Sequence, residues 1–260
     1  MYNIQTKHIE EMRELLYEEF GIHISDLKSA NILPKFTKML LNEKIQTADE
    51  FFSFLKKDFS HAKVMIAKYF TTNHTFFFRE EDHFEFLLKD IIEKKKNNIT
   101  IWSAASSTGE EAYSIVMTLL DRNMSQFKIL ASDLDKDVLH QFNKGEYNES
   151  RLSKVSASQR RKYFNEIRPG FVSIKKELRK HIYIKNLNLV DDLRFEKAFD
   201  YIFCRNVFIY FNDASRYKSL AMLSRNLKVG GFIFVGHTES MFNLPQGLQK
   251  IENSIFKKIS

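Results

Sequence analysis

A short apolar run near the middle of the chain gives way to small residues and then to an acidic helix start. Residues 99–109 read ITIWSAASSTG and are followed by Glu110 and Glu111. A strand that ends in small residues before a helix is typical of a ligand-binding turn in an α/β sheet, because a ligand can approach the backbone there. Two carboxylates in the first helical turn would repel a pyrophosphate. We therefore expect a ligand with positive charge, such as the sulfonium of S-adenosylmethionine (SAM).

A further acid follows a second apolar run, residues 127–132. Asp133 lies 24 residues beyond Gly109 in the chain. In doubly wound folds an acid at the end of the second strand accepts hydrogen bonds from ribose hydroxyls. The alternative is that Ser132 or Asp133 only caps the helix that begins near Lys136.

A third polar group ends the apolar run of residues 199–204. Arg205 and Asn206 follow it, and the carboxyl edge of such a sheet is where open α/β folds bind ligands. The phenol of Tyr210 could donate to a substrate carboxylate, although its apolar neighbours are equally typical of a core aromatic. We identify no basic residue that would activate Cys204 as a nucleophile, so we expect an inert buried thiol.

A fourth segment, residues 71–79, reads TTNHTFFFR. Asn73 and Thr75 carry side chains that suit ligand binding, and Arg79 suits a carboxylate. The alternative is an ordinary connection without a binding role.

The periodicity of apolar residues divides the chain into parts. Residues 1–70 repeat the helical spacing and predict a small helical domain, with helices over 8–20, 32–41 and 49–59 and Thr47 as an N-cap. Residues 71–96 form a linker and an entry helix. The helix over 35–44 carries Lys35, Lys38 and Lys44 and is the candidate for contacting an acidic partner helix.

Residues 97–260 alternate between strands and helices, which predicts an α/β fold with a doubly wound, mainly parallel sheet. The expected strands are residues 99–105, 127–132, 182–188, 199–204 and 231–236, with a last strand near 250–258. The expected helices are residues 84–94, 109–122, 135–143 and 213–227.

The alternation lapses in residues 147–184, where we expect a small basic β subdomain. Residues 171–174 and 181–184 could pair as a hairpin-like insertion, with Pro169-Gly170 as a turn. Residues 151–200 hold 13 Lys and Arg against 6 Asp and Glu, and the whole chain has a net charge of +7. This excess suits an acidic partner or is a solvated surface. Without basic repeats interleaved with aromatics, we expect no nucleic-acid partner.

The composition indicates a folded protein in a reducing compartment. Of 260 residues 43% are hydrophobic, and a single cysteine excludes a disulfide within the chain. No apolar run reaches the roughly 18 residues that a membrane span needs. We expect a cytoplasmic protein without membrane insertion.

Together these segments resemble the CheR family of SAM-dependent chemotaxis receptor methyltransferases. Five motifs occur in the family's order, and nearly the whole chain takes part in the likeness. The matching segments are residues 72–79, 102–114, 131–135, 203–211 and 236–240. The resemblance implies a class I, Rossmann-like SAM-methyltransferase fold with a helical N-terminal domain.

The resemblance also implies residue roles. The residues that would bind SAM are Asn73, Thr75, Arg79, Glu111, Asp133, Asn188, Leu189, Arg205 and Asn206. Among these, Glu111 would pair with the methionine end, Asp133 with the ribose, and Asn188-Leu189 would lie along the adenine. Arg79 and Tyr210 would hold the substrate glutamate and are the expected catalytic residues. No metal is expected.

The implied reaction transfers a methyl group from SAM to glutamate side chains of methyl-accepting chemotaxis receptors, giving methyl esters and S-adenosylhomocysteine (SAH). Some family members dock a receptor tail peptide on a longer glycine-containing loop, where this chain has the compact segment 167–171. We therefore expect a monomer that binds the cytoplasmic helical stalk directly through residues 1–70. The alternatives are a SAM methyltransferase acting on a small molecule or RNA, and a non-catalytic SAM-sensing or receptor-binding module.

Overall fold

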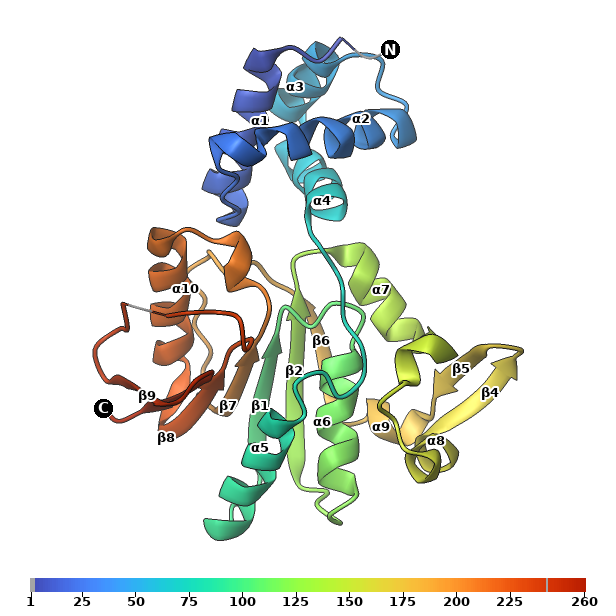
Figure 1. Cartoon of the computed structure of the whole chain (residues 1–260), viewed down its shortest axis with the longest axis vertical. Coiled ribbons are helices and arrows are strands. Elements are labelled where there is room, and N and C mark those ends of the chain that lie inside the picture. The colour runs from blue at the N-terminus through green and yellow to red at the C-terminus, as the bar shows by residue number, and fades with distance from the viewer. Residues whose placement is uncertain (1–2, 242) are drawn as a thin grey trace. The chain divides into compact units, whose positions relative to one another are not determined.

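A computed structural model describes residues 3–241 and 243–260 (Figure 1). Contacts divide the chain into two compact units. One runs to Thr72 and includes Tyr210–Arg216, and the other comprises Asn73–Ile209 and Tyr217–Ser260. Within the described residues, no helix is both long enough and apolar enough to cross a bilayer.

The first unit is helical. Its elements are α1 (Thr6–Phe20), the 3-10 helix η1 (Asp26–Asn31), α2 (Ile32–Asn42), α3 (Ala48–Lys57) and α4 (Phe59–Phe70). As predicted, the Thr47 hydroxyl caps α3 by accepting from the Glu50 N–H at 3.1 Å. The single helix expected over 49–59 is wrong at its end, because the chain breaks at Asp58. The Asp58 carboxylate caps α4 by accepting from the His61 N–H at 3.0 Å.

The core of the helical unit is aromatic. The rings of Phe36, Phe51 and Phe52 meet edge to face, with centroids 5.3 to 5.9 Å apart. Lys35 of α2 is half-buried, its ammonium group donates to the Phe70 carbonyl at 3.2 Å, and burial lowers its pKa. When the long stem of a lysine packs against an apolar helix face, its ammonium group still needs a polar partner, and here that partner is a backbone carbonyl.

The second unit contains a seven-stranded sheet, mainly parallel as predicted. Its strands are β1 (Ile99–Ala104), β2 (Phe127–Asp133), β6 (Ile182–Asn186), β7 (Phe199–Cys204), β8 (Leu227–Phe234), β9 (Leu248–Glu252) and β10 (Ile255–Lys258). Their order is β6-β2-β1-β7-β8-β10-β9, with β10 antiparallel to both of its neighbours. The single last strand expected near 250–258 is therefore wrong, because a turn at Asn253-Ser254 divides this segment into a hairpin.

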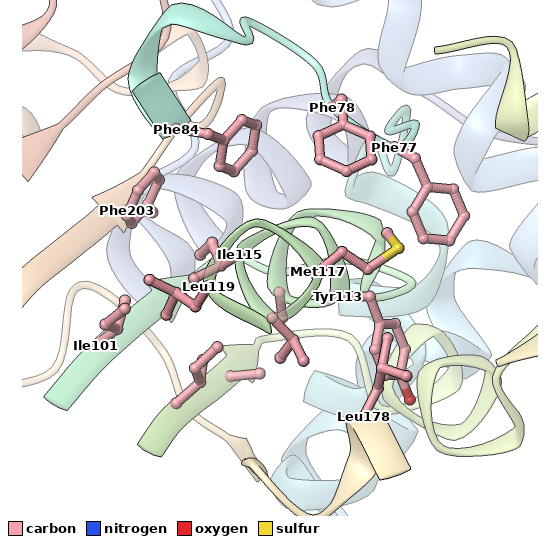
Figure 2. Packing of buried hydrophobic residues seen from close by; sticks show 14 of the residues in the cluster. Phe77, Phe78, Phe84, Ile101, Tyr113, Ile115, Met117, Leu119, Leu178 and Phe203 are labelled. Atoms are coloured by element: carbon pink, nitrogen blue, oxygen red, sulfur yellow. The ribbon is translucent and has the colours of Figure 1, made fainter. Parts of the chain in front are cut away.

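Helices cover both faces of this sheet. They are α5 (Asp82–Glu93), α6 (Glu110–Leu120), α7 (Lys136–Lys144) and α10 (Asp213–Arg225). The chain leaves β1 toward β2 and β6, and later returns to β7 on the other side of β1. Right-handed crossovers then place α6 and α7 on one face and α10 on the other. Figure 2 shows Phe84, Ile101 and Phe203 among the buried side chains around α6.

The insertion folds as a small three-stranded sheet with short helices (Figure 1, yellow). Its elements are β3 (Glu146–Asn148), the 3-10 helix η2 (Glu149–Leu152), α8 (Ala157–Tyr163), β4 (Phe164–Arg168), β5 (Phe171–Ile174) and α9 (Lys176–Arg179). Pro169-Gly170 forms the expected turn, with Gly170 at φ +76°. The expected pairing of residues 171–174 with 181–184 is wrong. A two-residue turn reverses the chain, so β5 pairs with β4, while residues 182–186 pair with β2 in the main sheet.

The one tryptophan of the chain lies in β1 and is fully buried. Its indole N–H donates to the Ser132 hydroxyl at 2.8 Å, and its ring packs against Phe195 and Phe199. Trp102 therefore ties β1 to β2 close to the carboxyl edge of the sheet.

Candidate active site

The turn between β1 and α6 lies where the strand order reverses, which is the usual ligand position in a doubly wound sheet. Ala105, Ser107 and Gly109 all have positive φ, at 63°, 50° and 94°. A Cβ on Gly109 would come within 2.3 Å of the Phe142 ring, so only glycine fits. The Ser106 hydroxyl is buried without a hydrogen-bond partner among the described residues. The turn thus combines a tight backbone with a polar atom that can still accept a ligand group.

Glu111 lies at this switch point. Its carboxylate accepts from the Ser103 hydroxyl at 2.7 Å and from Arg205 Nη1 at 3.2 Å. Burial raises the pKa of Glu111, while the Arg205 charge opposes that rise. The predicted acid therefore sits at the expected edge, but it already has a cationic partner.

Arg205 joins three segments of the unit. Its guanidinium is 2% exposed and donates to Glu80 Oε2 from Nε at 3.1 Å and from Nη2 at 2.9 Å. It also donates to the Arg79 carbonyl, and Asn206 Nδ2 donates to Glu80 Oε1 at 3.2 Å. Burial alone would raise the pKa of Glu80, but Arg205 more than offsets this and the pKa is lowered. Sequence reasoning missed Glu80, although an acid directly after Arg79 was a visible signal.

Glu110, the neighbour of Glu111, points to different partners. Its carboxylate is fully buried and accepts from the Thr108 hydroxyl at 2.6 Å and from the guanidinium of Arg151. Arg151 belongs to the insertion, and sequence reasoning missed it because 41 residues separate it from Glu110. The two adjacent acids therefore pair with two different arginines.

Asp133 ends β2 at the same edge of the sheet. Its two oxygens accept from the backbone N–H groups of Ser107 at 2.8 Å and Asp135 at 3.0 Å. Burial raises its pKa to about 6. The alternative that Ser132 or Asp133 caps the next helix is wrong, because Asp135 does so by accepting from the Asp137 N–H at 2.8 Å.

The linker after the helical unit reaches this edge. Asn73 donates to Asp135 Oδ2 at 3.0 Å, and its carbonyl accepts from the Ser107 hydroxyl at 3.2 Å. The Thr75 carbonyl lies 3.4 Å from Arg151 Nη1. Arg79 donates to the His74 carbonyl at 3.0 Å and keeps 28% of its side chain exposed. The linker is therefore bound to the turn, while Arg79 remains open to a ligand.

The last expected SAM residues follow β6. Asn188 and Leu189 are both buried, and the Leu189 carbonyl accepts from the Ser219 hydroxyl at 3.0 Å. They come directly after a strand that pairs with β2, so they continue toward the same carboxyl edge. Tyr210 belongs to the helical unit, where its carbonyl accepts from the His23 N–H at 2.7 Å.

Glu239 holds the segment after β7 in place. Its buried carboxylate accepts from the backbone N–H groups of Asn206 at 2.8 Å, Ile209 at 3.2 Å and Gly236. Burial raises the pKa of Glu239. The residue lies in a segment that resembles a family motif, but nothing in the sequence showed that it would bind a backbone loop.

Glu80, His83 and His237 each offer one potential metal-ligand atom within 4.8 Å of the others. Glu80 Oε2 already accepts two hydrogen bonds from Arg205, and the guanidinium would repel a second cation. Burial and Arg205 lower the pKa of His83 to about 4. We assign no metal to this cluster. Cys204 is buried, and burial raises its pKa far above the usual range, as expected for an inert thiol.

Known proteins resemble the chain over most of its length. Residues 73–256 match the family described as CheR methyltransferase, SAM binding domain. A chemotaxis protein methyltransferase of Borreliella burgdorferi is 33% identical, covering 98% of this chain and 95% of the relative. A probable one of Rhizobium etli is 33% identical (86% and 89%), and one of Salmonella typhimurium is 32% identical (93% and 86%). The chain belongs to the CheR family of SAM-dependent methyltransferases.

Proposed function

We propose that the protein transfers the methyl group of SAM to glutamate side chains of chemotaxis receptors, giving methyl esters and SAH. The observation that carries this proposal is the set of polar groups around the switch point. Glu111 and Asp133 lie at one edge of the sheet, and the linker that bears Arg79 is hydrogen-bonded to the same turn. This arrangement and the family membership support a sulfonium donor meeting an acidic acceptor.

The residues present suit SAM. When bound, SAM supplies a methyl group on a positively charged sulfur. Glu111 would hold the amino group of the methionine end, and Asp133 would accept from the ribose hydroxyls. The remaining residues proposed to line the site are Asn73, Thr75, Arg79, Asn188, Leu189, Arg205 and Asn206. The unpartnered Ser106 hydroxyl offers a further contact at the same turn.

The acceptor needs no general base. A glutamate carboxyl has a reference pKa of about 4.3, so at neutral pH its carboxylate is already nucleophilic. The chain must therefore orient the carboxylate in line with the methyl group and exclude water. We assign these tasks to Arg79, by charge-assisted hydrogen bonds, and to the Tyr210 hydroxyl.

The helical unit is the proposed receptor-binding part. Lys38 and Lys44 are exposed, and Lys44 lies just after the end of α2. Exposed ammonium groups suit acidic positions on a helical receptor stalk. The compact turn at Pro169-Gly170 leaves no long loop for a tail peptide, which supports direct binding without tethering.

The test is incubation of the full chain with methyl-labelled SAM and receptor-rich membranes. We expect label in receptor protein that mild base releases as methanol, since esters hydrolyse and N-methyl products do not. Base-stable label would favour a SAM methyltransferase of another substrate class, one that acts on a small molecule or RNA. SAH binding without any turnover would favour a non-catalytic SAM-sensing module. Arg79→Ala should lower turnover at least tenfold.

Tyr210→Phe separates binding of the acceptor from binding of the cofactor. We expect the variant to raise KM for the receptor several-fold while SAH affinity, measured by calorimetry, stays within twofold of wild type. An equal loss of both would remove Tyr210 from the proposed catalytic pair.

A further inference from the structure

Arg151 links the insertion to two segments proposed to bind SAM. Its Nη1 atom is hydrogen-bonded to the Glu110 carboxylate, lies 3.2 Å from the Thr108 hydroxyl and 3.4 Å from the Thr75 carbonyl. Thr75 is in the linker, whereas Thr108 lies in the turn before α6 and Glu110 is the first residue of α6. One guanidinium therefore joins the linker to the turn.

Other contacts between the insertion and these segments support the same junction. The Tyr147 hydroxyl, from β3, donates to the Thr108 carbonyl at 2.7 Å. The Phe77 ring of the linker meets Tyr147 and Phe164 edge to face, with centroids 5.0 and 5.3 Å away. In Figure 2, Phe77 lies beside α6 and next to Phe78. The insertion thus fixes both the linker and the turn.

Charge makes Arg151 the central member of this junction. Glu110 is fully buried, and a buried carboxylate without a counter-charge is strongly disfavoured. The Thr108 hydroxyl alone supplies one neutral hydrogen bond. Arg151 therefore has to stay at the turn, and its third contact then holds the Thr75 carbonyl there as well.

We propose that Arg151 is a positioning residue of the SAM site, which sets the distance between the linker residue Thr75 and the helix start that bears Glu111. This inference rests on the proposed SAM-binding roles of Thr75 and Glu111. Arg151 would act through the Thr75 carbonyl and the side chains of Thr108 and Glu110, and not by contact with the cofactor. It follows that the insertion contributes to the binding of SAM.

Calorimetry with SAH on the full chain tests this, alongside thermal unfolding of each variant. Arg151→Met removes the charge and all three contacts, and we expect the Kd for SAH to rise about tenfold. Glu110→Gln removes the charge that holds Arg151 at the turn but keeps an amide oxygen that can accept from Arg151, so we expect a smaller rise in Kd than for Arg151→Met, by about threefold. The exposed Arg161, also in the insertion, gives the matched control Arg161→Met, with an unchanged Kd.

The double variant Arg151→Met/Glu110→Gln separates positioning from simple structural support. The double variant has no unpaired buried charge, unlike Arg151→Met, so its midpoint of thermal unfolding should be near that of wild type. Its Kd for SAH should nevertheless remain at least fivefold above the wild-type value. In the methylation assay its KM for SAM should rise and its KM for receptor should not. A Kd within twofold of wild type would overturn the inference. Wild-type protein that fails to bind SAH would instead refute the proposed function.

Discussion

Glu110 and Glu111 are consecutive in the chain, and each forms an ion pair with a different arginine. Glu110 is fully buried and pairs with Arg151 of the insertion. Glu111 lies at the switch point and pairs with Arg205 at the end of β7. The two acids look alike in the sequence, but a helix turns by about 100° per residue, so their side chains leave in different directions. The Glu110 carboxylate joins α6 to the insertion, whereas the Glu111 carboxylate lies at the edge of the sheet proposed to bind the ligand.

This difference changes how the acidic turn should be understood. Two free carboxylates would form a strongly negative site, but here each has a cation within hydrogen-bond distance. Attraction for a sulfonium would then depend on Glu111, the single acid proposed to face the ligand, and not on the number of acids in the motif. A bound amino group can share Glu111 with Arg205, because a carboxylate has lone pairs for more than two donors.

The largest effect we expect is on stability, when either arginine is removed. Arg205→Met leaves Glu80 and Glu111 without their shared cation and should cost about 3–5 kcal/mol. Arg151→Met leaves one carboxylate unpaired instead of two, and Arg151 is 39% exposed so that solvent already screens this pair, so a smaller loss of about 1–3 kcal/mol is expected. Urea unfolding measures both. Equal losses of unfolding free energy in the two variants would contradict the expected difference between Arg205, which pairs with two carboxylates, and Arg151, which pairs with one.

The second prediction concerns ligand affinity. Glu111→Gln removes the charge proposed to bind the methionine end and should raise the Kd for SAH about 10- to 100-fold. Glu110→Gln is the matched control, since it makes the same chemical change one residue away. Calorimetry at neutral pH gives both values. If Glu110→Gln had the larger effect, the roles of the two acids would be reversed.

Asp133 extends the comparison to an acid held by backbone N–H groups. Burial raises its pKa to about 6, above the roughly 3.9 of an aspartate in an unfolded chain. Between these values the folded state holds the extra proton, so this group's contribution lowers stability as pH rises from about 4 to 6. In its proposed role the Asp133 carboxylate accepts from the ribose hydroxyls in its ionised form, so SAH affinity should rise about tenfold from pH 5 to pH 7. Asp133→Asn should bind SAH more weakly and without that dependence on pH.

The smallest effect is expected from exposed charges, which have no buried partner to leave behind. Lys38→Glu with Lys44→Glu should raise KM for the receptor a few-fold at low salt, and added salt should reduce the difference. SAH affinity should not change. Initial rates at several salt concentrations measure this, and identical kinetics at low salt would remove these lysines from the receptor surface.

The sequence predicted the mainly parallel sheet well, because strands and the polar residues that end them depend on local patterns. Apolar runs end in polar residues at Asp133 and Arg205, and parallel strands bring such ends together. The insertion was predicted poorly, because β4 (Phe164–Arg168) is almost wholly exposed and lacks an apolar rhythm. Contacts between distant residues were also missed. Glu80 meets Arg205 across 125 positions, and no local pattern reports such a pair.

The position of Trp102 makes the two units separable by optical spectroscopy. It is the chain's single tryptophan, it is buried in β1, and the helical unit carries no indole. Tryptophan emission therefore reports on the sheet unit, whereas far-ultraviolet circular dichroism records helices from both units. Where the two signals change at different urea concentrations, each unit has its own unfolding transition, and the emission curve assigns one of them to the sheet.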